Sequence, residues 1–171
     1  MLREFQPECF EDLILLLAAY RPGPMEFIPD IIKVKRGEIK ANYIIPELEQ
    51  ILKSTYGKPI YQEQLMDIFH ICAGFSLGEA DIIRRYMSKK KVDKFLAYKT
   101  KFVAGIHEHG ATLKQAEEFW ESLVDFSKYA FNKSHAAIYA VIAYQTAWLK
   151  YHYPDQFLCA VLNLSLIHIS E

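Results

Sequence analysis

Residues 129–154 read YAFNKSHAAIYAVIAYQTAWLKYHYP. From Ala136 onward almost every residue is apolar or aromatic, which is typical of a helix that is buried on all sides. Pro154 is expected to end this helix, because proline lacks a backbone donor and clashes with the preceding turn. The residues from Asn132 to His135 carry an amide, an ammonium group, a hydroxyl and an imidazole. The stretch therefore predicts a long core helix with a polar N-terminus.

The polar residues at this N-terminus allow two interpretations. In the first, Ser134 caps the helix by accepting a hydrogen bond from a backbone amide, while Lys133 is exposed and His135 has an ordinary partner. In the second, Lys133 and His135 lie beside the positive end of the helix dipole and form a site for a phosphate group or a base edge. The residues alone leave both interpretations open.

The composition indicates a folded chain without a strong overall charge. Of the 171 residues, 51% are hydrophobic and 14% aromatic, so a substantial core can form, and the formal net charge is −1. A nucleic-acid contact would therefore depend on local basic clusters. The cysteines, Cys9, Cys72 and Cys159, are far apart and are expected to be small apolar core residues of a reducing compartment. The apolar run near the start is too short to span a bilayer and has no basic leader, so a soluble intracellular chain is expected.

Apolar periodicity and capping signatures predict a mainly helical single unit. Ser76 with Glu79, and Thr112 three residues before a glutamine, match the capping box. At most a short strand is expected near residues 58–62. The expected helices cover residues 8–20, 47–52, 62–74, 77–91, 93–109 and 155–163, with one more that begins at Thr112 and another that follows Ser134 and ends at Pro154.

The clearest electrostatic feature is the basic group at the end of the helix that begins near Leu77. Guanidinium forks suit phosphate oxygens, so such a group could hold a triphosphate or a DNA backbone. Cations at a helix C-terminus also offset the negative end of the dipole, and periodicity by itself favours this second interpretation. The members of the group are Arg84, Arg85, Lys89, Lys90 and Lys91.

Other residues provide fewer candidates for chemistry. Tyr61 and Gln62 could contact a base, and Arg21 could contact a phosphate, although surface roles are commoner for such residues. No phosphate-binding glycine loop and no zinc-ligand spacing is present. The closely spaced acids are expected in first helical turns, where they serve the dipole, so no metal centre is expected among Glu47, Glu49, Glu79 and Asp81.

Four stretches together match one known family. In chain order they are AAYRPGPM, YGKPIYQEQLMDI, AGFSLGEADIIRRYMSKKK and YAFNKSHAAIYAVIAYQTAWLKYHYPDQFLCAVLN. With these stretches in register, the chain resembles the alpha subunit of bacterial DNA polymerase III, a C-family replicase, from about Glu11 to Asn163. The resemblance implies that residues 1–163 form part of the fingers domain, a largely helical module that closes on the incoming deoxynucleotide and the templating base.

The resemblance also implies roles for individual residues. The arginine pair matches residues implicated in holding the nucleotide's triphosphate, and the polar segment matches residues beside the nascent base pair. The expected nucleotide-binding residues are therefore Arg84, Arg85, Asn132, Lys133, Ser134 and His135. Further DNA or nucleotide contacts are expected, by the same matching, from Tyr61, Gln62, Lys89, Lys90 and Lys91.

The activity implied by the resemblance is DNA-templated DNA synthesis by a DNA-directed DNA polymerase, a nucleotidyltransferase of DNA replication in the cytoplasm. The implied partners are a dNTP and template–primer DNA, with a sliding clamp and other replisome subunits bound through regions absent from this sequence, and no membrane. The family's catalytic aspartates, and the Mg²⁺ that they bind, lie in an upstream palm segment. No catalytic or metal-binding residue is therefore expected here, and the chain alone is expected to be inactive.

The sequence departs from the family pattern at several positions. Tyr86, Ser88 and Ala130 stand where smaller residues are common, and Tyr86 could alter packing beneath the arginines. Residues 164–171, LSLIHISE, no longer follow the pattern and resemble read-through of a sequencing adapter, so a truncated fragment with a foreign tail is expected. Two alternatives for the isolated chain remain: a non-catalytic helical module that binds DNA or protein through the basic helix, or an excised piece that aggregates.

Overall fold

The computed structural model describes residues 1–89, 91–127 and 129–169, and most of them are helical. The elements, with η1 and η2 as 3₁₀-helices and η3 as a π-helical turn, are α1 (Leu2–Phe5), α2 (Phe10–Ala19), η1 (Pro24–Phe27), α3 (Ile28–Lys35), α4 (Glu47–Leu52), η2 (Lys53–Thr55), α5 (Gln62–Asp67), η3 (Ile68–Cys72), α6 (Leu77–Ser88), α7 (Val92–Leu96), α8 (Lys99–Glu108), α9 (Leu113–Ser127), α10 (Lys133–His152) and α11 (Pro154–Ile169). Strand-like pairing within the described residues consists of one isolated parallel bridge between Tyr61 and Phe131. The mainly helical prediction is confirmed, and the strand expected near residues 58–62 amounts to this bridge.

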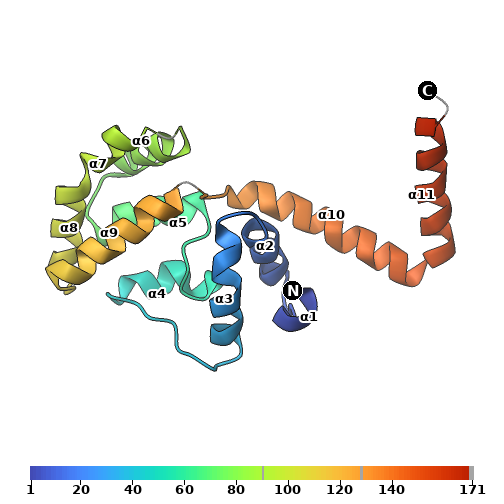
Figure 1. Ribbon diagram of the computed structural model, residues 1–171, viewed down its shortest axis with the longest axis horizontal. Coiled ribbons are helices and arrows are strands. Elements are labelled where there is room, and N and C mark those ends of the chain that lie inside the picture. The colour runs from blue at the N-terminus through green and yellow to red at the C-terminus, as the bar shows by residue number, and fades with distance from the viewer. Residues whose placement is uncertain (90, 128, 170–171) are drawn as a thin grey trace.

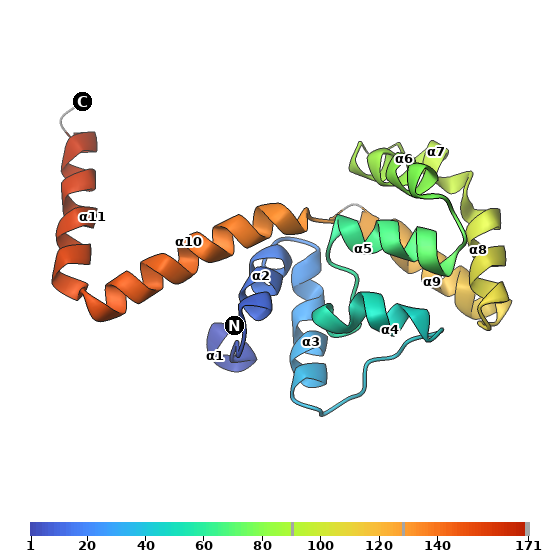
Figure 2. The same cartoon turned by 180° about the vertical axis from the view of Figure 1, so that it is seen from behind.

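The helices form a body from which a long arm extends (Figure 1). α4 to α9 form one group on the side of the body away from the arm, and α1 to α3 form a second group in which α2 lies beside the start of α10. α10 leads away from the body, and α11 turns sharply at its far end, as both views show (Figure 1 and Figure 2). The segment that joins α9 to α10 therefore lies where the body meets the arm.

The larger core has an aromatic cluster between η3, α7, α8 and α9, surrounded by aliphatic residues of α4, α5 and α6. The Phe95 and Trp120 rings stack at 4.5 Å, and Phe69 contacts both rings edge-on at 6.1 and 6.2 Å. All three side chains are at most 2% exposed. Burial of rings of this size adds to the stabilisation that the aliphatic side chains of the same core provide.

A second, smaller core joins α1, α2, α3 and the start of α10, and it contains a buried ion pair. Asp12 is 3% exposed and accepts hydrogen bonds from the Glu8 amide (2.9 Å), the Tyr56 hydroxyl (2.9 Å) and Lys35 Nζ (3.0 Å). Burial alone would raise the pKa of Asp12, but these donors together hold it below its ordinary value. Burial and the hydrogen bond to Asp12 raise the pKa of Tyr56 to about 12. Asp12 is therefore ionised at neutral pH and fully hydrogen-bonded.

Replacing Asp12 by asparagine is expected to lower the free energy of unfolding at pH 7 by about 2 kcal/mol, because Lys35 would keep only the exposed Glu8 as a carboxylate partner. Since the folded-state pKa of Asp12 is below its unfolded value of about 4, this stability is present above that pH and is lost as the pH falls through the folded pKa. Urea unfolding across the acidic range measures both effects. The matched control is Asp30→Asn, because Asp30 pairs with Lys58 at the surface, where such pairs contribute about 0.5 kcal/mol. A difference between wild type and Asp12→Asn that stays constant down to about pH 2 would contradict the assignment.

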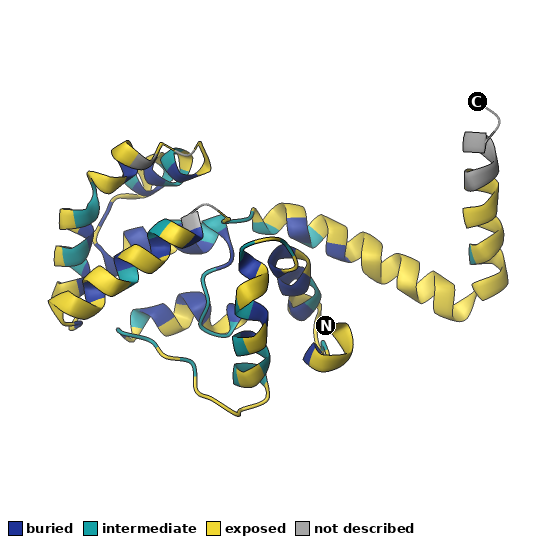
Figure 3. Cartoon of the chain, in the orientation of Figure 1, coloured by how far each residue is buried: buried dark blue, intermediate teal, exposed yellow. Residues whose placement is uncertain are grey.

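The prediction that the helix after Ser134 is buried on all sides is wrong. In α10 only Ala136 and Ala140 are buried, and every residue from Val141 to His152 is exposed (Figure 3). Apolar side chains lower the free energy of the chain only when they leave water, and for that they need another surface to pack against. Within the described residues α10 packs mainly on α2, through its first turns. No helix among the described residues is both long and apolar enough to cross a bilayer.

Most local signals are confirmed, with some corrections. The capping boxes form as predicted: the Ser76 amide donates to Glu79 Oε2 at 2.8 Å, and the Thr112 amide donates to the side chain three residues later at 3.0 Å. The expected helix over residues 93–109 is instead two helices, because the chain turns at Ala97 and Tyr98 between α7 and α8. The expectation that the cysteines are core residues holds for the buried Cys72 and is wrong for the exposed Cys9 and Cys159.

The tail expected to be foreign begins within α11. The backbone of this helix continues through Ile169, so residues 164–169 extend it, and residues 170 and 171 lie outside the described part of the chain.

Candidate functional site

The predicted site residues meet around two short backbone segments that lie side by side. The Phe131 amide donates to the Ile60 carbonyl at 3.2 Å, and the Gln62 amide donates to the Phe131 carbonyl at 2.9 Å. The Gln62 side-chain amide also donates to the Ala130 carbonyl at 3.2 Å. The segment before α5 is thus attached to the segment before α10, although about 70 residues separate them in sequence.

The arginine pair lies on α6, next to this junction. Arg84 donates through Nε (3.1 Å) and Nη2 (2.7 Å) to Asp81 Oδ1, and through Nη1 to Gln62 Oε1 at 3.3 Å. Arg85 Nε lies 2.8 Å from Asp81 Oδ2. Hydrogen bonds from Arg84, together with the charge of both arginines, hold the pKa of Asp81 below its ordinary value. A single carboxylate therefore contacts both guanidinium groups.

The N-terminus of α10 is capped by residues that the sequence did not single out for this role. Asn132 Oδ1 accepts from the His135 amide at 2.9 Å, so Asn132 is the N-cap and the prediction that Ser134 caps the helix is wrong. The Glu63 carboxylate accepts from the Lys133 amide at 3.1 and 3.2 Å. Lys133 Nζ pairs with Glu11 at 3.0 Å. The Glu63 carboxylate therefore lies at the positive end of this helix, and the Glu11 carboxylate neutralises its lysine.

Ser134 and His135 are exposed at the start of α10. The His135 ring packs against Phe131 (5.3 Å between ring centroids) and Tyr139 (4.7 Å). The His135 imidazole therefore lies at the surface beside two aromatic rings.

Arg21 and Tyr61 also lie at this junction. Arg21 donates through Nη2 to the Tyr129 carbonyl at 2.8 Å, and its guanidinium lies 3.9 Å from the centroid of the Phe131 ring. Tyr61 is 1% exposed, its hydroxyl has no hydrogen-bond partner among the described residues, and burial raises its pKa. Arg21 thus binds the segment before α10, whereas the Tyr61 side chain is buried in the core, and the DNA contacts of both remain predictions.

The lysines after the arginine pair lie on the link between α6 and α7. Lys89 and Lys91 are exposed, and Lys91 is the N-cap residue of α7. Lys90, which was predicted with them, lies outside the described residues. Tyr86 packs its ring near Tyr98 at 6.5 Å and thus fills space beside α7.

Comparison with known proteins identifies the family. Residues 1–110 match the model of the bacterial DNA polymerase III alpha subunit finger domain. The chain belongs to this family. Its curated relatives are named DNA polymerase III subunit alpha: that of Borreliella burgdorferi is 50% identical over 163 residues, that of Halalkalibacterium halodurans 49% over 163 residues, and that of Thermus aquaticus 44% over 167 residues. Each comparison covers 95% of this chain.

The chain is short beside these polymerase subunits. It spans 14% of the Borreliella burgdorferi protein and 15% of the Halalkalibacterium halodurans protein. The match to the finger-domain family contains the arginine pair on α6, Tyr61 and Gln62. The polar segment at the start of α10 follows the matched residues and is tied to them by the backbone junction described above.

Sequence reasoning missed the acids that contact the predicted site residues. Asp81 precedes the arginines by three and four residues, a spacing that brings side chains together on one helix face, and this signal could have revealed the pairing. Glu11 and Glu63 carry no such signal, because they meet Lys133 only through the packing of distant segments. Among the described residues, no three or more His, Cys, Asp or Glu side chains are grouped so that they could hold a metal ion.

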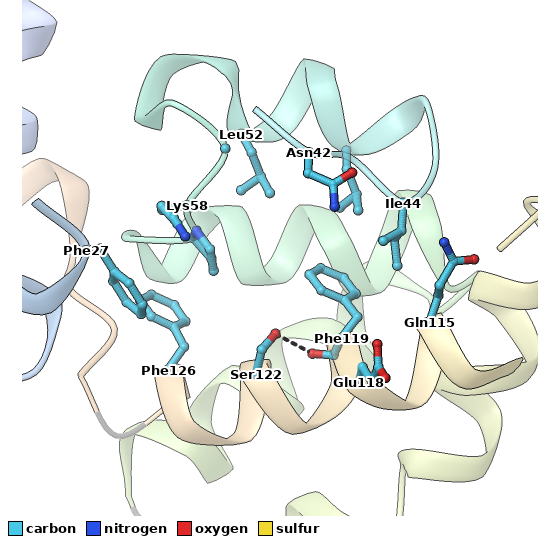
Figure 4. Close-up of a pocket in the computed structure, with 13 residues that line it drawn as sticks. Phe27, Asn42, Ile44, Leu52, Lys58, Gln115, Glu118, Phe119, Ser122 and Phe126 are labelled. Carbon is cyan, nitrogen blue, oxygen red and sulfur yellow. Dashed lines mark hydrogen bonds between the residues drawn. The ribbon is translucent and has the colours of Figure 1, made fainter. Parts of the chain in front are cut away.

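A separate cleft of about 420 Å³ opens between α9 and the chain from Asn42 to Pro59 (Figure 4). Phe119 and Phe126 from α9 face Leu52 across it, with amide groups of Asn42 and Gln115 at its rim. No predicted site residue lines the cleft. Lys58, which does line it, pairs with Asp30 at 3.0 Å, so this cation is already compensated.

Proposed function

We propose that this chain is the nucleotide-holding part of a bacterial replicative DNA polymerase, and that Arg84 and Arg85 bind the triphosphate of the incoming dNTP during DNA-templated DNA synthesis. The observation that supports this proposal is the placement of the pair: Gln62 bonds Arg84 at 3.3 Å and the segment before α10 at 3.2 Å. Two motifs that resemble the polymerase family, far apart in sequence, are thereby joined at one place. Family membership and this junction are the support for the assignment.

The chemistry of phosphoryl transfer fits such a site. Its catalysis depends on positioning and on neutralising the charge of the transferred groups, and guanidinium groups bind phosphate oxygens in a defined orientation. Because Glu63 already occupies the N-terminus of α10, we assign the phosphate to the arginines. We assign the contacts with the nascent base pair to the start of α10, that is to Asn132, Ser134, His135 and the aliphatic part of the Lys133 side chain. We assign contacts with the DNA or the triphosphate to the lysines after α6, which are Lys89, Lys90 and Lys91.

The rest of the polymerase activity is part of the same proposal. The catalytic aspartates, their Mg²⁺ and the contacts with the sliding clamp and other replisome subunits are assigned to regions of the subunit outside this sequence. We expect the enzyme to act in the cytoplasm on template–primer DNA, with residues 1–163 as part of its fingers domain. The 171-residue chain alone is expected to incorporate no nucleotide.

Reversing the charge of the pair, Arg84→Glu with Arg85→Glu, is expected to lower kcat/KM for dNTP incorporation about 100-fold or more, because two charge-assisted contacts are lost and like charges face the triphosphate. The measurement is single-nucleotide incorporation by a full-length alpha subunit that carries residues 1–163 of this sequence in place of its matching segment. Lys114→Glu is the matched control, since Lys114 is an exposed cation on α9.

Two results would redirect the assignment. An unchanged KM for dNTP and an unchanged turnover would refute the triphosphate contact. An unchanged KM for dNTP with weaker, more salt-sensitive binding of template–primer DNA would instead favour the alternative function, in which the basic helix contacts the DNA backbone.

A further inference from the structure

The contacts of Asp81 differ from those of an acid that serves only the helix dipole. Its carboxylate lies between two arginines of the next turn, with Oδ1 accepting hydrogen bonds from Arg84 and Oδ2 forming an ion pair with Arg85 Nε at 2.8 Å. Asp81 and Arg84 are each about 30% exposed, whereas Arg85 is 64% exposed. The carboxylate is therefore shared between the two guanidinium groups at the edge of the site.

The particular nitrogens involved matter for a phosphate ligand. Arg85 contacts Asp81 through Nε, and neither of its terminal nitrogens has a hydrogen-bond partner among the described residues. Arg84 uses Nε and Nη2 toward Asp81 and Nη1 toward Gln62. A guanidinium group has five N–H donors, so the terminal nitrogens of both arginines retain donors for phosphate oxygens. Contact through Nε orients the group without using the end that would meet a ligand.

We propose that Asp81 is a positioning residue of the triphosphate site, which orients Arg84 and Arg85 and offsets one of their two charges before the nucleotide arrives. This inference rests on the function proposed above. An arginine side chain has several rotatable bonds, and holding it in place in advance reduces the ordering that binding and reaction would otherwise require. Gln62 adds a second fixed point for Arg84, so that the pair is tied to the segment before α10.

Substitution of Asp81 has opposing effects on attraction and orientation. Asp81→Asn removes a negative charge, which strengthens the general attraction for a triphosphate. The amide nitrogen of asparagine cannot accept from an arginine, so at least one guanidinium loses its fixed orientation. A loss of orientation reduces the rate of the chemical step more than it reduces binding.

The test is single-turnover incorporation of one dNTP by the full-length subunit carrying this segment, with active-site titration to correct for misfolded enzyme. Asp81→Asn is expected to lower the maximal rate about 10-fold and to change the apparent Kd for dNTP by less than about 3-fold. Asp81→Glu, which keeps both acceptor oxygens, is expected to recover at least half of the rate. Asp93→Asn, at an exposed acid on α7, is the matched control. A merely structural role would change only the active fraction.

A second readout examines the geometry without nucleotide. In ¹⁵N spectra of the 171-residue chain, the Nε–H signals of Arg84 and Arg85 are expected to exchange slowly with water, and Asp81→Asn is expected to speed this exchange about 10-fold. A maximal rate and an exchange rate within 2-fold of wild type would overturn the inference. If Arg84→Gln itself leaves the rate and the Kd unchanged, the proposed function fails and the inference fails with it. If Arg84→Gln impairs both and Asp81→Asn impairs neither, only the inference fails.

Discussion

Replacing Gly105 by alanine is expected to destabilise the folded chain by about 3 kcal/mol, because the added methyl group meets backbone and not a side chain. A Cβ atom at this position in α8 would lie 2.4 Å from the Ala73 carbonyl oxygen and 2.7 Å from the Ala73 carbonyl carbon and Cα. Neither backbone can yield by changing a rotamer, so α8 would have to move away from the end of η3. That movement would loosen the aromatic cluster around Phe69 and Trp120.

The matched control for this prediction is Gly78→Ala. Gly78 also lies in a helix, α6, but an added Cβ there has no neighbour within 4 Å. Alanine has a higher helix propensity than glycine, so this substitution is expected to raise the free energy of unfolding by up to about 1 kcal/mol. Urea unfolding of both variants measures the difference. The same sign of effect in both would show that α8 does not approach Ala73 as closely as described.

Replacing Gly23 by alanine is expected to cost about 3 kcal/mol, from two separate causes. Gly23 has a φ of 98°, which side chains of L-residues rarely adopt, and its added Cβ would lie 2.5 Å from ring carbons of Tyr129. The Tyr129 ring is 43% exposed and could swing outward, but the segment before α10 would then lose this packing. Gly23→Ala is thus expected to displace the segment that carries Asn132 and its neighbours.

The two causes can be separated by a double-mutant cycle. Gly37→Ala is the control for backbone strain, because Gly37 has a φ of 73° and open space around it, and about 1 kcal/mol is expected. Tyr129→Ala combined with Gly23→Ala is expected to recover the steric part, about 2 kcal/mol, of the Gly23→Ala loss. Thermal and urea unfolding of these variants provide the values. Strictly additive effects of Gly23→Ala and Tyr129→Ala would contradict the close contact between them.

Local features of this fold were predictable because they depend on residues a few positions apart. α4 has the predicted bounds, Glu47–Leu52, and the capping box at Ser76 forms with its predicted partner. A capping box requires only a hydroxyl and a carboxylate or amide side chain three residues apart, whatever the rest of the chain does. The spacing of Asp81 before the arginine pair is a local signal of the same kind. Taken alone, the place of Asp81 in the first turns of the helix predicts only an acid that interacts with the helix dipole.

Other predictions failed where the outcome depends on distant segments. The composition of α10 indicated a buried helix, but most of its surface has no packing partner within the described chain. The choice of Asn132 over Ser134 as the cap depends on where the helix begins, and the pairing of residues 60–62 with 130–131 brings the chain to that point in an extended conformation. These outcomes depend on contacts that no short window of sequence contains.

The sequence by itself determined most of the helices, the capping boxes at Ser76 and Thr112, and the neighbouring guanidinium groups of Arg84 and Arg85 on α6, because these follow from chain geometry over three or four residues. Only the tertiary structure decided that Gln62 joins Arg84 to the segment before α10, and that Glu63 and Glu11 neutralise the start of that helix. The physical reason is that each of these contacts joins residues about 20 to 120 positions apart, whose meeting depends on how the two hydrophobic cores pack.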